Sequence, residues 1–135
     1  MSGTITGGCL CGNLRYESLR EPVRAVICHC SMCRKHSGAP ALGVVIFSVD
    51  AFRWVSHEPA WYASSERADR GFCPTCGSPL AMREHDERSV IEIYAGSLDE
   101  PNQVAIEDHV WASRQLSWLK VDDDLPRYPG RKPSA

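Results

Sequence analysis

The chain has 135 residues, of which 43% are hydrophobic and 24% are charged, and its formal net charge is −2. This length predicts one domain, and the nearly balanced charge argues against binding to nucleic acid or to an anionic membrane surface. No stretch approaches the ~20 consecutive apolar residues that a membrane-spanning helix needs. The first eight residues lack the basic start and apolar stretch of a secretory signal, so we expect a cytoplasmic protein.

Short β-strands are predicted along most of the chain. Each candidate segment alternates or is rich in β-branched and aromatic residues, and each is bounded by Gly, Pro, Ser or Asp. Strands this short and this regularly interrupted predict an all-β fold of antiparallel sheets. The predicted strands are residues 13–17, 23–28, 42–49, 52–56, 61–64, 80–83, 90–94 and 104–108.

One or two short helical turns are expected beside these strands. Ser31 is a candidate N-cap for a turn over residues 32–36, which Gly38 would end. A second turn is predicted over residues 113–120. The domain is expected to cover residues 1–128, with the Pro- and Gly-containing segment 129–135 as a C-terminal tail.

Seven cysteines are the most informative residues of the chain. Their odd number leaves one unpaired in any disulfide framework, and no export signal is visible, so their spacing favours metal binding. They form three groups, which are Cys9 with Cys11, then Cys28, Cys30 and Cys33, and finally Cys73 with Cys76.

The first and last cysteine groups together predict one structural zinc site. In the Cys73–Gly77 segment, two intervening residues let both sulfurs face one ion, and Gly77 permits the positive φ that such turns often need. Cys9 and Cys11 would point the same way on a strand. A zinc ion joining these distant segments would add its binding free energy, on the order of 10 kcal/mol, to folding. A single CxxC is also typical of a redox pair.

The middle group predicts a second zinc site with an exchangeable position. Cys28, Cys30 and Cys33 can surround one face of a zinc ion, and three protein ligands plus an open fourth position are typical of catalytic zinc. Alternatively, His36 reaches back from the next turn and closes the site. His29 is the poorer candidate, because it alternates away from its cysteine neighbours in an extended segment.

Two further alternatives remain open at this stage. Spacing allows the middle group to share Cys73 or Cys76. A three-thiolate zinc carries about one net negative charge, so Arg34 and Lys35 are interpreted either as cations that stabilise the thiolates or as solvated surface charges.

These motifs, taken in order, resemble the family of glutathione-dependent formaldehyde-activating enzymes. The resemblance covers about residues 4–128. It is carried by residues 8–12, 28–34, 72–78 and 96–99, with His109 and Trp118. Ser64 and Ser65, with Arg67 and Arg70, also resemble a family loop and are weak candidates for a cleft wall.

The resemblance implies a β-tent fold, like that of methionine-R-sulfoxide reductases, and two Zn²⁺ ions per chain. His109 matches a late histidine of the family and is a candidate to reach the open zinc or its ligand; the alternative is a hydrogen-bonded structural histidine. The implied structural ligands are Cys9, Cys11, Cys73 and Cys76, and the implied catalytic ligands are Cys28, Cys30 and Cys33.

The family reaction joins formaldehyde and glutathione to S-hydroxymethylglutathione, formally a carbon–sulfur lyase reaction run in reverse. We therefore interpret the chain as a zinc-dependent carbon–sulfur lyase-like enzyme that acts on an adduct of a small thiol such as glutathione. It is expected to be a monomer or homodimer, without a nucleic-acid or membrane partner. One alternative is a non-catalytic zinc module that binds a protein partner, because the same fold occurs in centromere protein V. Another is a thiol redox protein.

Overall fold

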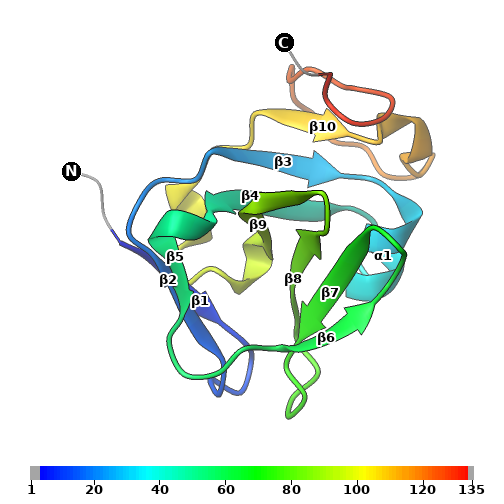
Figure 1. Ribbon diagram of the computed structural model, residues 1–135. Coiled ribbons are helices and arrows are strands. Elements are labelled where there is room, and N and C mark those ends of the chain that lie inside the picture. Colours follow the sequence, from blue (N-terminus) through cyan, green and yellow to red (C-terminus); the bar gives the residue numbers. More distant parts are fainter. Residues whose placement is uncertain (1–3, 134–135) are drawn as a thin grey trace.

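The computed structural model describes residues 4–133, which form two β-sheets and one short α-helix (Figure 1). The all-β prediction is confirmed. The smaller sheet has the strand order β1 (Ile5–Gly8), β2 (Arg15–Ser18), β5 (Phe52–Trp54). The larger sheet has the order β10 (Asp108–Val110), β3 (Arg24–Cys28), β4 (Leu42–Ser48), β9 (Glu87–Tyr94), β8 (Pro79–Glu84), β7 (Ala68–Phe72), β6 (Ala60–Ala63).

The pairing differs from the expected purely antiparallel arrangement at one edge. Strand β10 runs parallel to β3, with His109 opposite Ile27, whereas the other strand pairs are antiparallel. The strand predicted at residues 104–108 was placed too early, because β10 begins at Asp108. Strands β1 and β7 were not predicted, since their short sequences contain glycine and, in β7, alternating charges instead of a hydrophobic run.

The first helical turn is confirmed as α1 (Ser31–Ser37), which ends at Gly38 with φ of 75°. Its N-cap is Cys30 rather than Ser31, because the Cys30 sulfur accepts a hydrogen bond from the Cys33 amide. The second turn is shorter than predicted and comprises only η4 (Ala112–Arg114). The remaining 3₁₀ turns are η1 (Val49–Ala51), η2 (Ala95–Ser97) and η3 (Pro101–Gln103).

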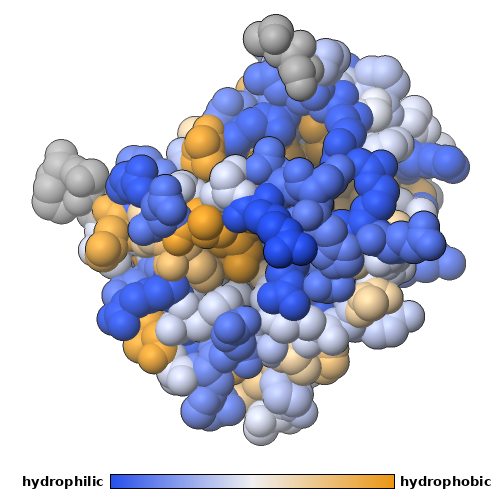
Figure 2. Space-filling model, in the orientation of Figure 1, coloured by the Kyte–Doolittle hydropathy of each residue, from blue (hydrophilic) through white to orange (hydrophobic). Residues whose placement is uncertain are grey.

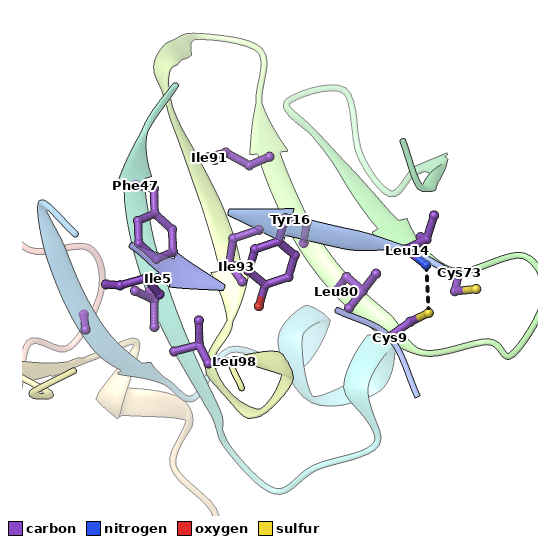
Figure 3. Packing of buried hydrophobic residues seen from close by; sticks show 13 residues of the cluster. Ile5, Cys9, Leu14, Tyr16, Phe47, Cys73, Leu80, Ile91, Ile93 and Leu98 are labelled. Atoms are coloured by element: carbon purple, nitrogen blue, oxygen red, sulfur yellow. Dashed lines mark hydrogen bonds between the residues drawn. The ribbon is translucent and has the colours of Figure 1, made fainter. Parts of the chain in front are cut away.

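The two faces of the large sheet bury different sets of side chains, because successive residues of a strand point to opposite sides. On one face, Val45, Phe47 and Ile93 pack against Ile5 and Tyr16 of the small sheet. Figure 3 shows Ile5, Tyr16, Phe47 and Ile93 close together, with Cys9 and Cys73 at one end of the cluster. The main hydrophobic core therefore lies on this face, and it includes Cys9 and Cys73.

The opposite face of the large sheet carries a second buried cluster. Its members include Val26, Val44, Tyr94 and Val110, together with Cys28 and Cys33 from β3 and α1. In Figure 1, α1 lies at the right of the view and the small sheet at the left, and α1 contacts β4. The strongest hydrophobic colour on the surface in Figure 2 gathers near β2 and β5, away from α1. Within residues 4–133, no helix has the length and apolar character needed to cross a membrane.

Candidate metal centres and the adjoining cavity

Four cysteines from two distant turns converge at one end of the main core. Cys9 and Cys11 lie in the turn between β1 and β2, and not on a strand as predicted. Cys73 and Cys76 lie in the turn between β7 and β8, which contains Gly77 with φ of 81°. The four sulfur atoms all lie within 4.8 Å of one another, and all four cysteines are free thiols.

The spacing of these sulfurs fits a tetrahedral metal ion. Four ligands at the usual Zn–S distance of 2.3 Å place the sulfurs about 3.8 Å apart. The Sγ–Sγ distance is 3.6 Å between Cys9 and Cys11 and 3.9 Å between Cys11 and Cys73. A disulfide would require about 2 Å. The donor set therefore suits a closed, four-thiolate zinc site.

Amide and hydroxyl groups donate hydrogen bonds to several of these sulfurs. The Leu14 amide lies 3.2 Å from the Cys9 sulfur, and the Cys76 amide lies 3.4 Å from the Cys73 sulfur. Hydrogen bonds from the Ser78 side chain and backbone are the main cause that lowers the pKa of Cys76 to about 5. Such hydrogen bonds stabilise negative charge on sulfur, which is the form that binds a metal.

A second group of three cysteines lies on the opposite face of the large sheet. Cys28 ends β3, Cys30 caps α1, and Cys33 lies in the first turn of α1. Their sulfurs also lie within 4.8 Å of one another, and the group has no fourth cysteine, histidine or carboxylate among the described residues. Contacts with Cys28 and Cys33 lower the pKa of Cys30 to about 2, while contacts with Cys30 and Cys33 raise the pKa of Cys28. Thiols this close together suit a cation held among them.

The two histidines considered as a fourth ligand have other partners. The His36 Nδ1 atom lies 2.6 Å from the Tyr94 hydroxyl. The His29 ring stacks on His109 and is not a member of the three-thiol group. This agrees with the expectation that His29 points to the opposite side from Cys28 and Cys30. Both histidines therefore lie outside the three-thiol group, and the middle cysteines do not share Cys73 or Cys76.

A buried arginine lies directly against the three thiols. The Arg70 Nη1 atom is 3.4 Å from the Cys33 sulfur and 3.2 Å from the Tyr94 hydroxyl. Arg70 is only 4% exposed. Burial lowers the pKa of its guanidinium, but the hydrogen bond and negative charge of Cys33 outweigh this effect and raise it. The charge of this side chain therefore faces the thiol group.

The three-thiol group opens on a cavity of about 650 Å³. This volume falls in the range of small-molecule sites. Apolar side chains of Val26, Val44 and Met82 line part of its wall. Burial, followed by the neighbouring Glu84, raises the pKa of the cavity residue Glu92 well above its ordinary value. Other charged residues on the lining are Arg24, Arg67, Glu84, Asp86, Glu87, Arg114, Arg131 and Lys132.

His109 contacts His29, the residue between Cys28 and Cys30, and belongs to neither thiol group. The His29 Nε2 and His109 Nδ1 atoms are 2.9 Å apart, and the two rings stack at 5.1 Å. The His109 Nε2 atom lies 2.9 Å from the Asp123 carboxylate, and this hydrogen bond is the main cause that lowers the pKa of Asp123 to about 2. His109 thus links His29, which lies between Cys28 and Cys30, to Asp123 in the C-terminal segment.

Replacing His109 by alanine is expected to lower the free energy of unfolding by about 3 kcal/mol. The fully buried ring would leave a cavity, and His29 and Asp123 would lose their partner. Urea unfolding followed by fluorescence measures the change. The matched control is His57→Ala, because His57 is exposed and its replacement is expected to change stability by less than about 0.5 kcal/mol. Equal effects of the two substitutions would contradict the linking role.

The sequence gives little sign of three residues beside the three-thiol group. Tyr94 lies in a predicted strand, and His29 lies between two cysteines and was considered only as a poor fourth ligand. Arg70 was only a weak candidate for a cleft wall, and it lies on the cavity lining. Arg34, one of the two cations considered for the thiolates, has no hydrogen bond to a sulfur among the described residues, and its buried Nε has no partner there.

Comparison with known proteins places this arrangement in a family. The chain is 34% identical over 76 residues to an uncharacterised lyase of Schizosaccharomyces pombe, an alignment that covers 55% of this chain and 53% of that protein. The chain therefore aligns with about half the length of this curated relative.

A crystal structure of a Rhodobacter sphaeroides protein has a similar fold, with a TM-score of 0.56 and 20% identity over 90% of this chain and 98% of that one. At this identity the likeness concerns the fold alone. Residues 4–114 match the family described as glutathione-dependent formaldehyde-activating enzyme. The three cysteine motifs and the two thiol groups that they form thus belong to a member of the glutathione-dependent formaldehyde-activating enzyme family.

Proposed function

We propose that the protein is a zinc-dependent carbon–sulfur lyase that makes and breaks the adduct of a small thiol with an aldehyde. The observation that carries this proposal is the group of Cys28, Cys30 and Cys33, which lacks a fourth protein donor within the described residues and opens on the cavity. The family description and the lyase relative support the reaction class. Glutathione and formaldehyde are the first substrates to test.

The reaction forms one carbon–sulfur bond and moves one proton from the thiol to the carbonyl oxygen. In the direction of synthesis, the thiol loses its proton and its sulfur forms a bond to the carbonyl carbon. The carbonyl π bond breaks at the same time, its electron pair moves to the oxygen, and the oxygen takes up a proton. A zinc ion held by Cys28, Cys30 and Cys33 would supply Lewis acidity and lower the pKa of a bound thiol. No oxidant or reductant is required.

The residues around the cavity have separate parts in this proposal. Val26, Val44 and Met82 exclude water from one wall, which strengthens electrostatic interactions inside. Glu92 lines the cavity, and its raised pKa favours the form that can give a proton to the oxygen of the aldehyde or its adduct. The four-thiolate group, on the other face of the sheet, would have a structural part only.

The test is the rate of exchange between formaldehyde, a thiol and their adduct, measured by NMR exchange spectroscopy with glutathione, cysteine and 2-mercaptoethanol. We expect zinc-loaded protein to accelerate exchange at least about tenfold over the uncatalysed rate with one of these thiols. Removal of zinc with a chelator should abolish the acceleration, and added zinc should restore it. Uncatalysed rates with every thiol and fully loaded protein would contradict the proposal and favour a binding module.

A further inference from the structure

A zinc ion in the three-thiol group would carry a buried net negative charge, whereas the four-thiol group is partly exposed to water. A divalent ion with three thiolates has a net charge of −1, and the ligands Cys28 and Cys33 are 7% and 3% exposed. Burying an unbalanced charge costs several kcal/mol. We propose that Arg70 is the cation that balances this centre and thereby sets its affinity for zinc. The inference rests on the second metal centre of the proposed function.

The contact between Arg70 and the thiols is direct. The guanidinium donates from Nη1 to the Cys33 sulfur at 3.4 Å. Arg70 reaches this position from β7, where it lies opposite Met82 of β8, on the sheet face that carries the second cluster. Arg70 is buried and lies in a strand of the sheet, so the position of its guanidinium is more restricted than that of a surface arginine.

Arg70 has no competing carboxylate within ion-pair distance among the described residues. Seven other arginines there pair with an acid, namely Arg15, Arg24, Arg53, Arg67, Arg83, Arg127 and Arg131. Glu92 also lines the cavity but forms no ion pair with Arg70, and burial, followed by Glu84, raises its pKa and so disfavours its charged form. The negative charge that a buried Arg70 can balance is thus that of the thiolates.

A hydrogen-bonded chain fixes the orientation of the guanidinium. Nη1 also donates to the Tyr94 hydroxyl at 3.2 Å, and that hydroxyl lies 2.6 Å from Nδ1 of His36 on α1. Burial is the main cause that raises the pKa of Tyr94 to about 12, so the hydroxyl keeps its proton and can donate it to His36. Among the described residues, the buried Nε atom of Arg70 has no hydrogen-bond partner, so Nη1 makes the contacts that orient the group.

The four-thiol group shows the contrast. A zinc ion there would have a net charge of −2, but Cys11 is exposed and Cys76 is half-buried, so water screens the charge. Arg15, whose charge acts on Cys9, is tied to Asp99 by an ion pair. A buried, carboxylate-free arginine accompanies the three-thiol group and not the four-thiol group.

The test is the affinity of each zinc, measured by competition with a chromophoric chelator. We expect Arg70→Gln to raise the dissociation constant of the weaker zinc at least about tenfold, which corresponds to about 1.4 kcal/mol, and to leave the tighter zinc unchanged. Arg70→Lys keeps the charge and is expected to stay within about threefold of the wild type. Arg88→Gln removes an equal charge from an exposed position and should have no effect.

The outcomes separate this inference from the proposed function, because lyase activity is not the readout. Equal affinities in the wild type and Arg70→Gln, with two zincs bound, would overturn the role of Arg70 alone. An Arg70→Lys protein as weak as Arg70→Gln would also overturn it, since geometry and not charge would then matter. A wild-type protein that binds one zinc would overturn both proposals. If Arg70→Gln does not fold, Arg70→Met provides the same charge removal with an apolar side chain of similar length.

Discussion

Replacement of Cys73 by alanine is expected to abolish cooperative folding. Cys73 is fully buried in the main core, and its sulfur is one of four that join the β1–β2 turn to the β7–β8 turn. A structural zinc contributes roughly 10 kcal/mol or more, which is comparable to the whole stability of a domain of this size, about 5–15 kcal/mol. Near-ultraviolet circular dichroism and thermal unfolding measure the loss.

The control for this prediction is a cysteine of the other group. Cys30→Ser removes a thiolate from the three-thiol group, which does not join the two sheets, and should unfold cooperatively. Comparable unfolding curves for wild type and Cys73→Ala would show that the four thiols do not carry the fold through a metal. A chelator strong enough to strip both ions should reproduce the Cys73→Ala result on wild-type protein.

Replacement of Cys30 by serine is expected to reduce the zinc content from two per chain to one and the proposed exchange activity by about 100-fold or more. Loss of a first ligand should exceed the 10–100-fold effects typical of groups that only support the ligands. Serine is chosen because its oxygen can still accept the hydrogen bond that the Cys30 sulfur takes from the Cys33 amide at 3.3 Å. Elemental mass spectrometry counts the zinc.

Two comparisons make the Cys30 result specific. Cys30→Ala removes the cap as well as the ligand, so a difference in stability between the alanine and serine variants measures the cap, about 1 kcal/mol. The far-ultraviolet spectrum of Cys30→Ser should match that of the wild type. Two zincs retained in this variant, or full activity with one zinc, would rule out Cys30 as a ligand of the reacting centre.

Much of the architecture was predictable because strand patterns are local. The runs that became β3, β4 and β9 contain consecutive β-branched and apolar residues, and the structure places strands there with small changes at their ends. β1 and β7 escaped prediction because pairing with neighbouring strands, and not intrinsic propensity, stabilises such glycine-containing segments. The parallel pairing of β10 with β3 joins residues about 80 positions apart, which no local pattern specifies.

The division of the cysteines was also predictable, but for a different reason. Two ligands from one short segment have few ways to face a common ion, so CxC and CxxC spacing limits which sulfurs can converge. The structure brings together the same sets of four and three that spacing and the family resemblance indicated. Cys9 and Cys11 were expected to point the same way on a strand, but it is the turn between β1 and β2 that brings their sulfurs together.

What the sequence by itself determined is the fold class, the family and the grouping of the seven cysteines, because these depend on local spacing and on motifs in order. What only the tertiary structure decided is the surroundings of the three-thiol group. Arg70 and Cys33 are 37 positions apart, and His29 and His109 are 80 positions apart. The histidine contact arises because β10 pairs with β3, and the Arg70 contact arises because the helix that follows β3 lies within reach of a side chain of β7. Neither contact depends on a local pattern, so a single arginine or histidine in the sequence does not indicate it.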